Sequence, residues 1–102
     1  MHQNWNELLN KASNENNEQL IIRYSYLFTL QLLWKNGLIQ FKIEKTNADY
    51  YHELKHVDIK QHFKIISNQY EIVWYGAYPI EQNKSEKFQQ SFHELTKMLG
   101  KS

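Results

Sequence analysis

The chain has 102 residues, a formal net charge of +1 at neutral pH and no cysteine. This length suits one folded unit, and we expect a single domain over residues 1–102. The balanced charge and the single arginine argue against nucleic-acid binding, which usually needs a basic surface, and the lack of cysteine excludes disulfides and thiolate metal sites.

The first predicted element is a short helix that begins after Asn4. Asn4 is a favourable N-cap, and Glu7 stands three residues later, in the spacing of a capping box. Apolar residues then recur at helical spacing, at Trp5, Leu8, Leu9 and Ala12. The polar run 13–17 predicts a loop after this helix.

Residues 19–35 predict a long β-strand. Every even position from 20 to 34 is apolar or aromatic, and the polar side chains fall on odd positions, as on the two faces of a strand. Asn36-Gly37 follows, and this dipeptide favours a hairpin turn because both residues tolerate positive φ. A turn there pairs apolar positions of the strand with apolar positions in 38–44, so we predict a hairpin over 19–44.

The segment 46–61 supports two interpretations. Residues 46–49 are typical of a turn or a helix cap, and a helix capped by Asp49 would have an apolar stripe at Tyr50, Leu54 and Val57. A strand would alternate apolar and polar residues from Val57 to Ile65. We favour a helix or irregular turn first and a strand from about Val57 onward.

A second hairpin is predicted next, with strands at 62–66 and 70–75 around the loop 67–69. We expect Gly76 and Pro79 to end it. The last element is a helix with Asn83 as its N-cap and Gly100 as its stop. Its apolar stripe consists of Phe88, Phe92, Leu95 and Leu99.

These elements predict the α+β class. We expect a mainly antiparallel sheet of four to five strands, built from two hairpins, with the N- and C-terminal amphipathic helices packed on one face. The element order loosely resembles the α-β-β-α-β-β-α arrangement of secretion chaperones, a resemblance that implies topology and nothing about activity.

One stretch points to metal chemistry. Residues 52–56 read His-Glu-Leu-Lys-His, and this H-E-x-x-H pattern resembles the signature of the zincin metallopeptidases; with His62 it resembles the longer metzincin motif. The resemblance implies that His52 and His56 bind zinc while Glu53 activates water. Ile59 occupies the position of the glycine that the metzincin motif requires, so we expect no metal, no other cofactor and no catalytic residue, and keep a zinc-dependent hydrolase as the alternative.

The aromatic residues suggest an interaction surface instead. The chain has seven tyrosines and three tryptophans, more than a two-layer core needs. Exposed tyrosines are favoured at protein interfaces, because they bury a large area at a low cost in entropy. The other interpretation is that each ring is half-buried with its hydroxyl in water. We predict a partner-binding surface made of Tyr50, Tyr51, Tyr70, Tyr75 and Tyr78.

The expected function is therefore binding of another protein without catalysis, as in inhibitors, immunity proteins, anti-defence proteins or chaperones. We expect neither nucleic acid nor membrane as a partner, and homo-oligomerisation stays open. No stretch has the length and apolarity of a membrane span, and no signal peptide is visible. We therefore expect a cytoplasmic location.

Overall fold

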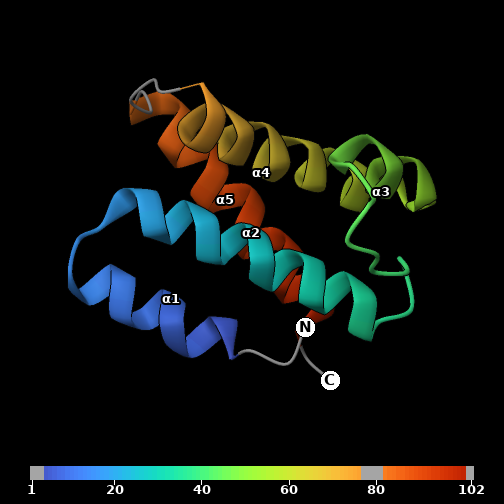
Figure 1. Cartoon of the computed structure of the whole chain (residues 1–102), viewed down its shortest axis with the longest axis horizontal. Coiled ribbons are helices and arrows are strands. Elements are labelled where there is room, and N and C mark those ends of the chain that lie inside the picture. The colour runs from blue at the N-terminus through green and yellow to red at the C-terminus, as the bar shows by residue number, and fades with distance from the viewer. Residues whose placement is uncertain (1–3, 77–81, 101–102) are drawn as a thin grey trace.

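The computed structural model describes residues 4–76 and 82–100, and within these ranges the chain forms five helices and no strand. The helices are α1 (Trp5–Asn14), α2 (Glu18–Lys35), α3 (Asn47–Glu53), α4 (Val57–Tyr75) and α5 (Gln82–Leu99) (Figure 1). The predicted α+β class, with its antiparallel sheet and two hairpins, is therefore wrong.

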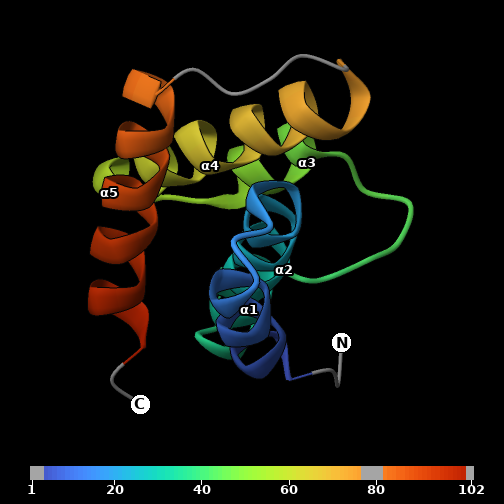
Figure 2. The same cartoon turned by 90° about the vertical axis from the view of Figure 1, so that its left-hand side faces the viewer.

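Helix α2 lies at the centre of the arrangement. It packs against α1, α4 and α5, and the short helix α3 packs against α4. Figure 2 shows α5 standing beside the α1–α2 pair, with α4 crossing above them. The core between these helices contains buried residues from α2 to α5 and from the loop after α2, with Leu33, Phe63, Ile66 and Leu95 entirely enclosed.

The alternation in 19–35 does not reflect a strand, because α2 is covered by three neighbouring helices. A helix covered on most sides carries apolar residues around most of its circumference, so a period of two can arise by coincidence. The buried positions follow the helical period: Ile22, Ser25, Tyr26, Thr29, Leu30, Leu32 and Leu33. Ser25 and Thr29 belong to the polar set of the strand interpretation, yet both are buried, and the Thr29 hydroxyl donates to the Ser25 carbonyl at 2.8 Å.

Asn36-Gly37 ends a helix instead of joining two strands. Asn36 is the C-cap with a φ of −88°, whereas Gly37 has a φ of +72°. The Gly37 N–H donates to the Trp34 carbonyl and the Leu38 N–H donates to the Leu33 carbonyl, which is the hydrogen-bond pattern of a Schellman motif. The property that suggested a hairpin turn, tolerance of positive φ, is used here for helix termination.

The predicted second hairpin is also wrong, since residues 57–75 form one helix of 19 residues. Its buried apolar residues recur at helical spacing: Ile59, Phe63, Ile66, Tyr70 and Val73. Upstream, the first of the two alternatives, a helix and not an irregular turn, forms as α3, but Thr46 is its N-cap in place of Asp49 and Val57 lies outside it. The strand predicted from Val57 onward is replaced by the first turns of α4.

The two terminal helices are confirmed, although the described part of the chain contains no sheet beneath them. Asn4 caps α1 by accepting a hydrogen bond from the Glu7 N–H at 3.1 Å. Helix α5 begins at Gln82, so Asn83 lies inside its first turn and is not its N-cap. Phe88, Leu95 and Leu99 are buried as predicted, Phe92 is half-buried, and the helix ends before Gly100. Pro79 lies outside the described residues.

The Schellman motif predicts a graded response at Gly37. Gly37→Ala should lower the free energy of unfolding by about 1–2 kcal/mol, because an L-residue resists the left-handed conformation. Gly37→Val should cost more and Gly37→Asn less, since β-branched residues resist positive φ and asparagine tolerates it. An added Cβ meets no atom within 4 Å, so the cost is conformational and not steric. Urea unfolding of the three variants measures the order, and equal stabilities would contradict it.

Asn68 tests whether 57–75 is one helix. It lies in the middle of α4 and is exposed. Asn68→Pro should lower the free energy of unfolding by about 3 kcal/mol or more, because proline removes a backbone donor and clashes with the preceding turn. The control Asn68→Ala should stay within about 0.5 kcal/mol of the parent. A proline variant as stable as the alanine variant in urea unfolding would show that 67–69 is a loop.

Candidate functional site

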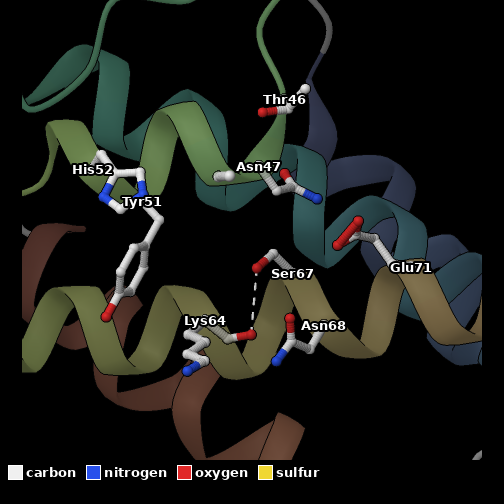
Figure 3. Close-up of a pocket in the computed structure, with 9 residues that line it drawn as sticks. Thr46, Asn47, Tyr51, His52, Lys64, Ser67, Asn68 and Glu71 are labelled. Carbon is white, nitrogen blue, oxygen red and sulfur yellow. Dashed lines mark hydrogen bonds between the residues drawn. The ribbon is translucent and has the colours of Figure 1, made fainter.

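A cleft of about 560 Å³ lies between α3 and α4 (Figure 3). On one side it is lined by the N-cap and successive turns of α3: Thr46, Asn47, Ala48, Tyr51 and His52. On the other side it is lined by one face of α4: Lys64, Ser67, Asn68 and Glu71. Six of these nine residues are exposed, so the cleft is open to solvent along its length.

Helix α3 is held in place by hydroxyl groups at its first turn. The Thr46 hydroxyl accepts from the Asp49 N–H, and the Asp49 carboxylate accepts from the Thr46 N–H at 2.9 Å. The hydrogen bonds from Thr46 lower the pKa of the Asp49 carboxyl below its ordinary value. The Tyr26 hydroxyl of α2 also donates to the Asn47 side-chain oxygen, so the N-terminus of α3 is attached to the central helix.

Tyr50 anchors the same helix from its inner face. It is 3% exposed, and its hydroxyl donates to the Lys42 carbonyl at 2.8 Å. Burial raises the pKa of Tyr50, which favours the protonated hydroxyl as a donor. Because Tyr50 points into the core, the next residues, Tyr51 and His52, turn toward the cleft.

The other wall of the cleft is one face of α4, and the helical period determines which side chains lie on it. Phe63, Ile66 and Tyr70 face the core, and the exposed residues Lys64, Asn68 and Glu71 follow one another at spacings of four and three on the cleft side. Ser67 is buried between the two sets, and its hydroxyl donates to the Lys64 carbonyl at 3.3 Å. The α4 wall is therefore a line of polar side chains on one helix.

The positive charge of Lys64 and the negative charge of Glu71 lie at different places along the row of polar side chains on α4. Lys64 and Glu71 lie two helical turns apart, which is about 10 Å along the axis of α4. Within the described parts of the chain, the side chains of Lys64, Asn68 and Glu71 take part in no hydrogen bond or ion pair. The Lys60 ammonium group lies 4.5 Å from the centre of the Tyr51 ring, so further positive charge lies toward the Lys64 end.

The five tyrosines of the predicted surface lie in different environments. Tyr50 and Tyr70 are buried, so the expectation that they face outward is wrong. Tyr70 stacks on Tyr26 with ring centres 4.0 Å apart, and burial raises the pKa of Tyr70 to about 12. Tyr51 lines the cleft, Tyr75 is 77% exposed at the end of α4, and Tyr78 lies outside the described residues. Of the four tyrosines that the structure describes, Tyr51 is the one that lines the cleft.

The H-E-x-x-H stretch does not lie on one helix. Helix α3 ends at Glu53 and α4 begins at Val57, with Leu54 inserted into the core between them. The His56 ring caps α4 by accepting from the Ile59 N–H at 3.4 Å. His62 lies farther along α4, with its Nδ1 atom 3.3 Å from the Ser91 hydroxyl of α5. The arrangement that the zincin motif requires, two histidines on one helical face, is therefore not formed.

Glu53 is also committed to other partners. Its carboxylate lies 2.6 Å from the Lys45 ammonium group and accepts from the Gln40 N–H at 3.0 Å. The hydrogen bond from Lys45 is the main reason why the pKa of the Glu53 carboxyl is lowered. Among the residues that the structure describes, no three histidine, aspartate or glutamate side chains are placed to hold a metal ion.

Comparisons with known proteins assign neither a family nor a function to this chain. The chain matches no protein-family model, and no curated protein or solved structure matches it. In the described ranges, no helix combines the length and apolarity needed to cross a membrane. The site must therefore be interpreted from its own geometry.

Lys64, Asn68 and Glu71 belong to none of the motifs that the sequence shows. Their common signal is the spacing of four and three, which marks one face of a helix, and it is visible only when 57–75 is assigned as a helix. The strand interpretation distributed the same residues over a hairpin and its loop, so they did not form a group.

The Glu53–Lys45 contact predicts a pH-dependent stability. Because the Glu53 pKa is lowered in the folded protein, its contribution is present above the unfolded-state pKa of about 4.3 and is lost as the pH falls through the folded-state pKa. Glu53→Gln should lower the free energy of unfolding at neutral pH by up to about 1 kcal/mol, as for a partly exposed ion pair. The difference between the variant and the parent should shrink as the pH falls below about 4.3 and vanish below the folded-state pKa of Glu53.

Glu44→Gln is the matched control, because Glu44 is exposed in the same loop and has no ion-pair partner within the described ranges. It should change the free energy of unfolding by less than about 0.5 kcal/mol, both at neutral pH and at acidic pH. Urea unfolding at neutral pH and at acidic pH measures these differences. A Glu53→Gln effect that persists unchanged at acidic pH would contradict the assigned role of the carboxylate.

Proposed function

We propose that this protein is a non-enzymatic binding domain that holds a short segment of another protein in the α3–α4 cleft. The observation that carries the proposal is the cleft itself. Two helices attached to one core present Tyr51 and a line of polar side chains whose hydrogen-bonding groups are not used within the described structure. An aromatic ring beside adaptable polar groups is a combination typical of surfaces that recognise proteins.

The shape of the cleft favours a peptide segment over an enclosed small molecule. Pockets for small molecules bury most of the ligand surface. Here the residues that face the opening include the exposed polar residues His52, Lys64, Asn68 and Glu71. Such a surface can hydrogen-bond the backbone of a segment that lies along it while the remainder of the partner stays outside.

Catalysis is not part of the proposal. The hydroxyl of Ser67, which lines the cleft, donates to a backbone carbonyl and is not paired with a base. A nucleic-acid partner is disfavoured by the carboxylate of Glu71 and by the net charge of +1. A cytoplasmic location belongs to the proposal and is supported by the absence of cysteine from the sequence. Whether the domain acts as an inhibitor, an immunity or anti-defence protein or a chaperone depends on its partner.

Selection from a random peptide library displayed on phage tests this function. The selected peptides are synthesised, and their affinities are measured for the parent, for Ala48→Trp and for Asn10→Trp. Ala48 is exposed at the edge of the cleft, whereas Asn10 is exposed on α1. A tryptophan at position 48 fills the cleft and should weaken binding by about tenfold or more, which corresponds to about 1.4 kcal/mol.

The control variant Asn10→Trp should bind as the parent does, and circular dichroism should show that both variants are folded. Peptides that bind the parent and Ala48→Trp equally well would place recognition elsewhere and contradict the proposal. A library that yields no binding peptide would contradict it as well.

A further inference from the structure

The charges along α4 specify the kind of segment that the cleft accepts. We infer that the bound segment is extended in a polyproline II-like conformation and carries an acidic and a basic side chain three residues apart. The acidic side chain lies at the Lys64 end of the cleft and the basic side chain lies at the Glu71 end. This inference rests on the proposed function, since it names the chemistry of the partner for the same cleft.

The two ends of the cleft differ in charge. His52 and Lys64 line one end, and Lys60, stacked on Tyr51, lies close to it. Glu71 lines the other end, where Figure 3 shows it apart from Tyr51 and His52. Asp49 of α3 and Arg23 of α2 have partners of their own. The Asp49 carboxylate is engaged by the Thr46 N–H, and the Arg23 guanidinium lies 4.8 Å from the centre of the Trp74 ring.

The spacing of Lys64 and Glu71 along α4 favours one backbone conformation of the segment over another. Lys64 and Glu71 are separated by about 10 Å along α4. In a polyproline II segment, residues three apart point to the same side and lie about 9 Å apart. In a β-strand, residues on the same side lie about 7 Å apart when separated by two positions and about 13 Å apart when separated by four. The polyproline II spacing therefore fits best.

The middle of the cleft suits such a backbone. A polyproline II segment forms no internal hydrogen bonds, so its carbonyl and N–H groups need external partners. Asn68 projects between Lys64 and Glu71 with an unused amide, and Asn47 faces it from α3. The Asn47 side-chain oxygen accepts from Tyr26, so its amide group is left to donate to a carbonyl of the segment. Aromatic-lined grooves are a recurring site for polyproline II segments, and Tyr51 supplies the aromatic ring here.

Other ligands fit the same charges less well. A polyphosphate or a nucleic-acid backbone would place negative charge against Glu71. The ammonium and carboxylate groups of a free amino acid are attached to the same carbon, so they cannot reach both ends of the cleft. A segment with two separated side chains of opposite charge meets both requirements.

Short capped peptides test the inference by fluorescence anisotropy at low ionic strength, where exposed charges are least screened. The peptide with the core Asp-Pro-Pro-Lys should bind the parent at least about fivefold more tightly than Asp-Pro-Pro-Asp, Lys-Pro-Pro-Lys, Asp-Pro-Lys or Asp-Pro-Pro-Pro-Lys. Lys64→Glu should shift the preference toward Lys-Pro-Pro-Lys, and Glu71→Lys should shift it toward Asp-Pro-Pro-Asp. Both residues are exposed and make no side-chain ion pair in the described structure, so both variants should stay folded.

The outcomes separate this inference from the proposed function. Peptides that lose affinity in Ala48→Trp but show no preference for charge or spacing overturn the inference and leave the proposed function standing. Peptides whose affinity does not change in Ala48→Trp contradict the proposed function itself. Tighter binding of a single-stranded oligonucleotide than of any peptide, or charge preferences that do not change in Lys64→Glu and Glu71→Lys, would also overturn the inference.

Discussion

Three neighbouring helices bury α2, and their contacts with it hold the arrangement together. The helix carries apolar residues around most of its circumference, and α1, α4 and α5 cover them. Ser25 and Thr29 are buried among these contacts, and the Thr29 hydroxyl satisfies its hydrogen bond within α2 itself. Small polar side chains of this kind let neighbouring helices approach without leaving an unpaired group in the core.

The same central helix positions both walls of the candidate site through one residue. The Tyr26 ring stacks on Tyr70 of α4, and its hydroxyl donates to Asn47 of α3. Burial raises the pKa of Tyr26, so the hydroxyl keeps its proton and stays a donor. The relative position of α3 and α4 is therefore determined by the core, and a ligand in the cleft does not have to order the walls, which reduces the entropic cost of binding.

The H-E-x-x-H stretch shows why a short motif has chemical meaning only in its structural context. Zinc binding by this pattern requires the two histidines one turn apart on a continuous helix. Leu54 adopts an extended conformation and enters the core, so α3 ends between His52 and His56. His56 then serves as the N-cap of α4, and Glu53 holds the preceding loop through Lys45 and Gln40. Residues that could have formed a metal site instead stabilise the boundary between two helices.

The two terminal helices follow from the sequence alone, because each has one apolar stripe and a polar remainder, and that contrast has a helical period. The sequence also shows that position 37 needs a residue that tolerates positive φ. Whether Gly37 ends a helix or turns a hairpin was decided by tertiary structure, as were the conformations of 19–35 and 57–75. A segment covered on most sides is apolar on most sides, so its periodicity no longer distinguishes helix from strand.

The residues of the candidate site also come together only because 57–75 is a helix. Tyr70 turns inward, and Lys64, Asn68 and Glu71 form one line, because α4 is a helix packed on α2. Tyr50 is buried on the inner face of α3, which packs on α4.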